Sequence, residues 1–144
     1  SLRLFNVYGP SQNPEGDYAA VVPKFLEAAS NGVAPKIFGD GKQSRDFVYI
    51  DDVVDAFVKA SGLAHDADAL PINVGSGKSV TLLELIDAIS EAKGSTLTPE
   101  FHPARKGDIR DSCAVVKRAS ETLGWEAKTP LNEGLKSMLS ALSV

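Results

Sequence analysis

Hydrophobic side chains recur every three to four positions in five stretches of the chain, a spacing that predicts amphipathic helices. The sets expected to face a core are Val22, Phe25, Leu26 and Ala29; Val54, Phe57, Val58 and Ser61; Leu82, Leu85, Ile86 and Ile89; Val116, Ala119 and Leu123; and Leu131, Leu135, Met138 and Leu142. Asn31, Gly94 and Gly124 stand where helices should end. Thr81 and Glu84 have the spacing of a capping box at the start of the third helix.

Strand patterns lie between these helices. Residues 2–7 form an apolar run that ends at the turn signal Tyr8-Gly9-Pro10, and residues 71–74 and 96–101 are further strand candidates. Residues 36–50 read KIFGDGKQSRDFVYI, and the Asp-Gly turn in the middle predicts a β-hairpin. Asp51 or Asp52 is the expected cap of the following helix, and residues 64–69 the expected polar linker. The elements lack a regular βαβ rhythm, so the predicted fold class is mixed α/β (α+β).

Composition narrows the class of protein. The chain has 144 residues, of which 43% are hydrophobic, enough for one domain with a core. A net charge of −4 without a basic stripe argues against a nucleic-acid partner, and the apolar runs are too short to cross a membrane. Cys113 is the single cysteine, which fits a cytoplasmic location. Cys113, His65 and His102 do not have the spacing of a metal-ligand motif, so no metal is expected.

The sequence INVGSGKSVTL, residues 72–82, resembles the end of a phosphate-binding P-loop. That loop requires G-x-x-x-x-G-K-[ST], because backbone N–H groups on both sides must surround the phosphates. Position 72 holds isoleucine where the first glycine of the motif would stand. The stretch therefore predicts a joint between a strand and a helix, in which the glycines serve tight backbone geometry, and not an ATPase or GTPase site.

Two groups of charged residues fall in predicted loops or strand ends. They are Ser44-Arg45-Asp46 and Arg105-Lys106-Gly107-Asp108. Because arginine binds phosphate through two parallel hydrogen bonds, the two arginines could straddle a diphosphate while Asp108 accepts from a hydroxyl. Ordinary surface salt bridging is the alternative, and it is the commoner explanation of such charges.

No catalytic constellation stands out. No G-x-G-x-x-G dinucleotide motif follows a strand, and no Ser–His–Asp pattern is evident. A Tyr-x-x-x-Lys pair is also missing, since none of the three tyrosines has lysine four positions later. No residue of the chain is therefore predicted to be catalytic.

Five segments in register resemble the C-terminal half of the nucleotide-sugar epimerase/dehydratases, which are extended short-chain dehydrogenase/reductases. The segments are LRLFNVYGP, YAAVVPKF, IFGDGKQSRDFVYIDDVVDA, INVGSGKSVTLLEL and RKGDIRDS. The sequence is most similar to UDP-sugar 4-epimerases that act on UDP-glucose or UDP-N-acetylglucosamine. The resemblance implies that residues 1–144 are one substrate-binding domain lacking most of the Rossmann domain. Residues 1–9 would be a strand left over from the cofactor domain.

The resemblance also implies that the intact enzyme uses NAD, held by the missing N-terminal Rossmann domain and not by this chain. The implied UDP-sugar site is built from Asn6, where sugar, diphosphate and nicotinamide would meet; Val22 and Lys24 beside the nucleotide; Ile37, Phe38 and Gly39 along the uracil; Arg45 and Arg105 on either side of the diphosphate; and Asp108 at the uridine ribose. The chain alone is expected to be inactive.

Other functions remain open. The chain could belong to a nucleotide-sugar dehydratase, decarboxylase or reductase of the same superfamily, or it could be a stand-alone binding module without catalysis. Fold alone does not separate these. Leu2, Leu4 and Val7 are expected on an exposed edge strand, and unpaired strand edges promote self-association.

Overall fold

A computed structural model describes residues 1–15, 20–63 and 70–142 of the chain. The helices in this part are α1 (Val21–Ser30), α2 (Ile50–Ser61), α3 (Leu82–Lys93), α4 (Lys117–Leu123) and α5 (Leu131–Leu142). The short strands are β1 (Leu2–Leu4), β2 (Asn6–Tyr8), β3 (Lys36–Phe38), β4 (Ser44–Arg45), β5 (Phe47–Tyr49), β6 (Ile72–Val74), β7 (Val80–Thr81) and β8 (Glu100–His102). The predicted mixed α/β class is confirmed, and the predicted linker at 64–69 lies outside the described residues.

The strands pair two by two, and sequence neighbours do not pair with each other. β1 pairs with β6, β2 with β5 and β3 with β8, all parallel, whereas β4 and β7 are antiparallel. The hairpin predicted over residues 36–50 is therefore wrong. The turn itself is present, since Gly39 and Gly41 have φ values of 92° and 74°. A turn signal fixes local geometry only, and here each arm of the turn pairs with a distant segment.

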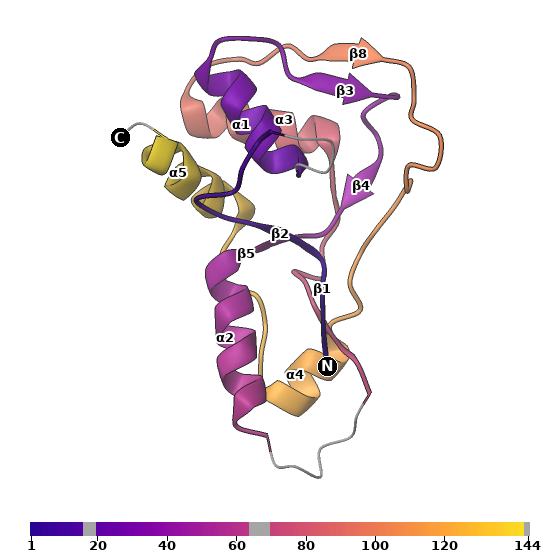
Figure 1. Ribbon diagram of the computed structural model, residues 1–144, viewed down its shortest axis with the longest axis vertical. Helices are drawn as coiled ribbons and strands as arrows, with labels where there is room; N and C mark the ends of the chain where they lie inside the picture. The colour runs from indigo at the N-terminus through magenta and orange to yellow at the C-terminus, as the bar shows by residue number, and fades with distance from the viewer. Residues whose placement is uncertain (16–19, 64–69, 143–144) are drawn as a thin grey trace.

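The predicted strand over residues 2–7 is broken in two at Phe5. The Phe5 N–H donates to the Val74 carbonyl, and the next N–H, of Asn6, donates to the Asp46 carbonyl. The chain thus leaves β6 and joins β5 within two residues, which places Asn6 at the start of β2. Figure 1 shows this crossing between an upper part with α1, α3, α5, β3 and β8 and a lower part with α2, α4 and β1.

Each part has its own hydrophobic core. The upper core packs α1, α3 and α5 against Tyr8, Phe47 and Tyr49, and the lower core surrounds Trp125 with residues of α2, α4, β5 and β6. Burial raises the pKa of Tyr8 well above its usual value, and its hydroxyl donates to the Leu131 carbonyl at 3.5 Å. These contacts hold β2 and β5 in place, and with them Asn6 at the start of β2 and Arg45 of β4, which directly precedes β5.

The apolar faces predicted for α1 and α3 are confirmed, because the residues named for each are buried. The predicted capping box of Thr81 and Glu84 is present as well. In α5, Leu135 and Met138 are buried but Leu142 is 57% exposed, since it lies at the far end of the helix.

The face predicted for α2 is wrong. Val54, Phe57 and Val58 are 53%, 53% and 63% exposed, and the buried side carries Asp52, Val53 and Ala56. Neither Asp51 nor Asp52 caps the helix through its side chain, as Tyr49 is the N-cap. Asp52 accepts instead from the backbone N–H groups of residues 128 and 129, at 3.1 and 3.0 Å. The hydrogen bonds of the buried Asp52 to residues distant in the chain therefore decide which face of α2 is buried, and it is not the face that hydrophobicity alone predicts.

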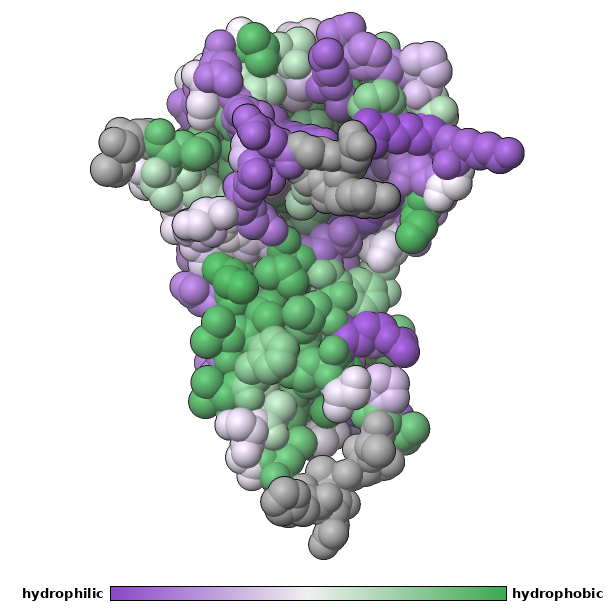
Figure 2. All heavy atoms as spheres, in the orientation of Figure 1, coloured by the Kyte–Doolittle hydropathy of each residue, from purple (hydrophilic) through white to green (hydrophobic). Residues whose placement is uncertain are grey.

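The exposed side of α2 forms part of an apolar surface. Figure 2 shows hydrophobic side chains gathered over α2 in the lower part of the molecule. Leu4 of β1 is 42% exposed, while Leu2 and Val7 are half-buried against the lower core. Self-association through β1 stays a prediction. Within residues 1–15, 20–63 and 70–142, no helix is both long and apolar enough to span a membrane.

Candidate functional site

A cleft of about 730 Å³ opens in the upper part of the molecule, between α1, β3, β4 and the loop at residues 105–108. Its wall carries more positive than negative side chains, although the chain as a whole is acidic. The cations are Lys24, Lys36, Arg45, Arg105 and Lys106, and the carboxylates are Glu27 and Asp108. A concave site with an excess of cations favours an anionic ligand.

Arg45 is held in the cleft by its strand and by two hydrogen bonds. β4 pairs with β7, where Arg45 lies opposite Val80. Its Nη1 donates to the Ser44 carbonyl at 2.8 Å, and its Nη2 donates to Asp108 Oδ1 at 2.6 Å. With its side chain only 16% exposed, Arg45 presents a largely fixed guanidinium to the cleft.

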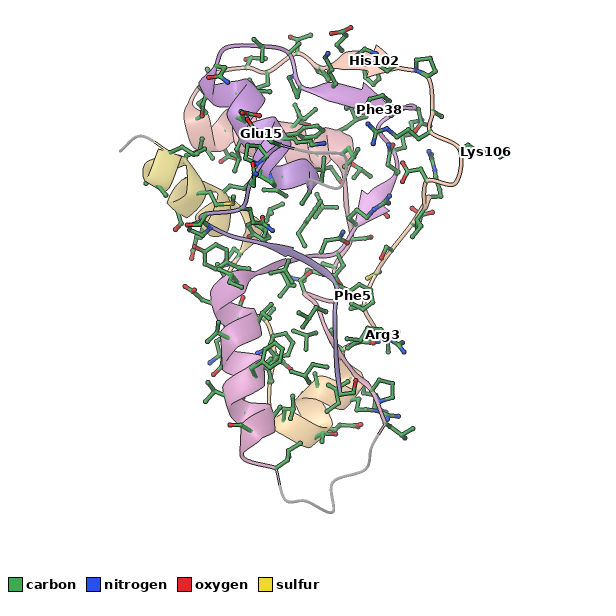
Figure 3. All side chains as sticks on the ribbon, in the orientation of Figure 1. Arg3, Phe5, Glu15, Phe38, His102 and Lys106 are labelled. Atoms are coloured by element: carbon green, nitrogen blue, oxygen red, sulfur yellow. The ribbon has the colours of Figure 1, made fainter. Side chains whose placement is uncertain are left out.

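Arg105 lies over the aromatic ring of Phe38, which also lines the cleft. Its guanidinium carbon is 3.7 Å from the centre of the Phe38 ring, a cation–π contact. The His102 ring lies 5.4 Å from the same ring. Figure 3 shows Phe38 and His102 near each other, beside the loop that carries Lys106. This end of the cleft therefore combines an aromatic surface with a positive charge.

The loop that carries Arg105 is anchored at its C-terminal end. Arg110 donates to both carboxylate oxygens of Asp40, at 2.7 and 3.1 Å, and this pair lowers the pKa of Asp40 to about 2. Ser44 holds the same end of the loop through two hydrogen bonds. Its N–H donates to the Arg110 carbonyl, and its hydroxyl donates to Asp111. Arg45 and Arg105 thus reach one cleft although sixty residues separate them in the chain.

The structure brings six of the nine predicted site residues to the cleft wall: Asn6, Lys24, Phe38, Arg45, Arg105 and Asp108. The other three lie beside it. Val22 and Ile37 are buried in the upper core, 1% and 0% exposed, and the Gly39 N–H donates to the His102 carbonyl.

Sequence reasoning missed Gln43, which also lines the cleft and is 5% exposed. Its Nε2 donates to the Phe38 carbonyl at 2.7 Å. The only signal in the sequence was its position two residues before Arg45, which places both on one side of an extended chain.

The glycine–serine loop after β6 binds a carboxylate of the protein itself. Asp46, 0% exposed, accepts at Oδ1 from the Ser76 N–H and hydroxyl, both at 2.7 Å. At Oδ2 it accepts from the N–H groups of Gly77 and Ala114, both at 2.9 Å. A Cβ on Gly75 would lie 2.6 Å from the Ala114 Cβ and 2.9 Å from Asp46 Oδ2, so the loop requires glycine there.

This loop therefore has no place for a phosphate, whether of ATP or of a dinucleotide, because Asp46 already fills it. Instead, the hydrogen bonds to Asp46 join three segments. These are the strand segment that contains Arg45 and Asp46, the turn after β6, and the segment that follows the Arg105 loop. The same loop does not fit the diphosphate of NAD, which needs a glycine-rich turn that is open to it.

The cleft combines two arginines with an aromatic ring on short strands and helices, an arrangement suited to an anionic ligand. The chain belongs to the NAD dependent epimerase/dehydratase family, whose sequence model matches residues 1–75, just over half of it.

Among similar proteins is a UDP-glucose 4-epimerase from Mycolicibacterium smegmatis, 49% identical over 90% of this chain and 41% of its own length. A UDP-glucose 4-epimerase structure from Thermotoga maritima, with UDP-glucose, matches 99% of this chain and 45% of that one, with a TM-score of 0.91 and 42% identity. A UDP-glucuronic acid 4-epimerase from Bacillus cereus, with a UDP-sugar analogue and NAD, matches 99% of this chain and 44% of that one, with a TM-score of 0.89 and 28% identity.

Other similar proteins include UDP-glucuronic acid decarboxylases, a dTDP-L-rhamnose 4-epimerase and a dTDP-4-dehydro-6-deoxyglucose reductase. The chain spans less than half the length of the relatives described above. It therefore corresponds to one part of such enzymes, and residues that determine their reaction type can lie outside it.

Proposed function

We propose that the chain is the nucleotide-sugar-binding portion of an NAD-dependent UDP-sugar 4-epimerase. The observation that carries this proposal is the convergence of Arg45 and Arg105 on one cationic cleft next to the Phe38 ring. A UDP-sugar has the complementary parts, namely two phosphates for the arginines and a planar base for the aromatic surface.

In the proposed complex each cleft residue meets a different part of the ligand. Arg45 and Arg105 bind the diphosphate, and Asp108 accepts from a ribose hydroxyl. Phe38 faces the uracil, and Asn6, at the start of β2, lies toward the sugar with an amide that can donate and accept. Lys24 adds positive charge at the α1 side. Val22, Ile37 and Gly39 contribute by holding their neighbours in place, because the side chains of Val22 and Ile37 are buried.

The chemistry of the proposed enzyme is shared between this chain and the remainder of the protein. NAD supplies oxidation and reduction at the sugar when it is bound in such enzymes; no residue of this chain is proposed to hold it, and Asn6 is proposed to lie near the nicotinamide. The role of this chain is to bind uridine diphosphate and orient the sugar, since binding energy from a remote group can position the reacting one. The chain alone is proposed to be inactive.

A second candidate is a decarboxylase or reductase of nucleotide sugars, because the relatives include UDP-glucuronic acid decarboxylases and a dTDP-4-dehydro-6-deoxyglucose reductase. The nucleotide site proposed above would serve those reactions equally, because it does not contact the reacting carbon. The non-enzymatic alternative is a stand-alone module that binds a nucleotide sugar without catalysis. Joining the chain to the part of the M. smegmatis relative that lies outside the match, and assaying UDP-glucose, UDP-glucuronic acid and their products, would separate the enzyme classes.

Arg45→Ala and Arg105→Ala are expected to weaken UDP binding to the 144-residue chain about 10- to 150-fold each. A charge-assisted hydrogen bond contributes about 1.5–3 kcal/mol, which corresponds to that range. Uridine, which lacks the phosphates, should be affected far less. Arg→Lys should recover part of the loss, since lysine keeps the charge but lacks the planar fork. Titration calorimetry with UDP and uridine measures all of these.

Arg118→Ala is the matched control for these titrations, because Arg118 is an exposed arginine of α4, away from the cleft. It should bind UDP as the unchanged chain does. UDP affinities equal to the unchanged chain in both cleft variants, or an equal loss for UDP and uridine, would contradict a diphosphate site at the arginines.

A further inference from the structure

Residues 103–109, here called the strap, run past the cleft between two fixed ends. Residues 105–108 of the strap line the cleft, and Figure 3 shows Lys106 at its outer bend. One end is held because the Gly39 N–H donates to the His102 carbonyl, and the other because the Ser44 N–H donates to the Arg110 carbonyl. All side chains of the strap are exposed. Its middle can therefore move while both ends stay in place.

A tight turn brings two charged residues of the strap to the cleft. The Asp108 N–H donates to the Arg105 carbonyl at 3.3 Å, and Gly107 inside the turn has a φ of 84°, a value that favours glycine. Arg105 and Asp108 thus lie at the two ends of one turn, and Asp108 accepts from Arg45 at 2.6 Å. In the part of the chain that the structure describes, this is the one hydrogen bond that joins the strap to another segment.

Asp108 occupies the side of Arg45 that a phosphate would need. The Nη1 of Arg45 donates to the Ser44 carbonyl, and its Nη2 donates to Asp108. A phosphate that binds this guanidinium through two hydrogen bonds requires the position of the carboxylate. The phosphate and the carboxylate also repel each other as like charges. A phosphate ligand therefore has to displace Asp108 from Arg45.

We propose that Asp108 is an internal competitor for Arg45, through which the cleft selects phosphates that carry a neighbouring hydroxyl group. This inference rests on the proposed function, that the cleft binds the UDP part of a UDP-sugar. The displaced carboxylate is only 37% exposed and needs a new donor. A ribose hydroxyl supplies one, whereas inorganic diphosphate offers negative charge and acceptors. A nucleotide thus replaces the bond that it breaks, and a bare phosphate does not.

The same exchange controls the strap. Loss of the bond to Arg45 removes the one hydrogen bond that the strap makes to another segment. A bare diphosphate on Arg45 then leaves the strap open. A nucleotide closes it again, because Asp108 binds the ribose next to the phosphates.

The test uses three ligands, namely UDP, 2′,3′-dideoxyuridine diphosphate and inorganic diphosphate, titrated by calorimetry into the 144-residue chain and into Asp108→Ala. Inorganic diphosphate and the dideoxy compound should bind Asp108→Ala about two- to fivefold more tightly, because a partly exposed ion pair no longer competes. UDP should bind it more weakly, because the hydroxyl loses its acceptor. The preference for UDP over inorganic diphosphate should fall at least tenfold, the size of one charge-assisted hydrogen bond.

Glu27→Gln is the matched control, since it removes the other carboxylate of the cleft wall and leaves the bond to Arg45 intact. It should move all three affinities in one direction. The same pattern in Asp108→Ala, or no change there, would overturn the competitor role. A dideoxy compound that follows UDP would overturn the role of the hydroxyl. In both cases UDP binding to the unchanged chain keeps the proposed function, and its absence removes that function.

A second measurement tests the strap without any ligand. Trypsin cleavage after Arg105 and Lys106, followed by mass spectrometry, should be about two- to fivefold faster in Asp108→Ala than in the unchanged chain. Asp87→Ala, which removes an exposed carboxylate of α3, should be cleaved there at the unchanged rate. Equal rates for Asp108→Ala and the unchanged chain would show that Asp108 does not hold the strap, whatever the outcome of the titrations.

Discussion

Asp46→Ala should lower the free energy of unfolding by about 3–5 kcal/mol, because it removes a buried charge that satisfies several donors. Without the carboxylate, the N–H groups of Ser76, Gly77 and Ala114 lose their acceptor, and each such group costs about 1–3 kcal/mol if water does not replace it. Asp46→Asn should lose nearly as much, since its amide nitrogen would face N–H groups. Urea unfolding followed by circular dichroism measures both.

Asp87→Ala is the matched control for the loss of a negative charge. Asp87 is an exposed residue of α3, and a surface substitution of this kind changes stability by about 0.5 kcal/mol or less. Equal midpoints for Asp46→Ala and Asp87→Ala would mean that the glycine–serine loop does not depend on the carboxylate. The description of that loop as an internal anion site would then be wrong.

Trp125→Ala should be comparably destabilising, by about 3–5 kcal/mol, as is usual when a buried tryptophan is truncated. Trp125 is 1% exposed at the centre of the lower core, and its Nε1 donates to the Asp52 carbonyl at 2.9 Å. Trp125→Phe keeps most of the ring and loses this hydrogen bond, so it should cost a smaller amount, about 1–3 kcal/mol. Circular dichroism is the appropriate probe, because Trp125 is the only tryptophan in the chain.

The ranking of the two variants distinguishes packing from hydrogen bonding at this position. A larger loss for Trp125→Ala than for Trp125→Phe is expected if the ring volume stabilises the lower core. Equal losses would show that the bond to the Asp52 carbonyl dominates, contrary to the packing described here.

Helices with one apolar stripe could be predicted from the sequence, and α1 and α3 are the examples. Their apolar residues occupy a single face, so only one orientation buries them. α2 has apolar residues on two sides, and the choice between them is made by Asp52, which bonds to residues 128 and 129. Nothing in the local sequence places those residues next to the helix, so the predicted face was the exposed one.

Strand pairing shows the same limit. The Asp40-Gly41 signal correctly marks a turn, but β3 and β4 pair with β8 and β7, which come from much later in the chain. Pairs between strands that are distant in the chain form through tertiary packing, and a turn signal carries no information about them.

The candidate site was partly visible in the sequence. Arg45 and Arg105 stood out by residue type and by resemblance, and their meeting in one cleft depends on contacts such as Arg110 with Asp40. Gln43 gave no such signal, because its place at the cleft wall depends on the hydrogen bond from its amide to the Phe38 carbonyl. Asp46 was visible only as part of a charged triplet, and its four donors come from two separate segments.

The central claim is that the cleft between α1, β3, β4 and the 105–108 loop binds the uridine diphosphate of a UDP-sugar. The most direct measurement is a titration of UDP into the ¹⁵N-labelled chain, with NMR signals of the backbone and of the arginine side chains. The account predicts saturable shifts at Phe38, Arg45 and Arg105, with Arg118 of α4 unchanged. The absence of saturable shifts, or shifts centred on the apolar side of α2, would contradict it.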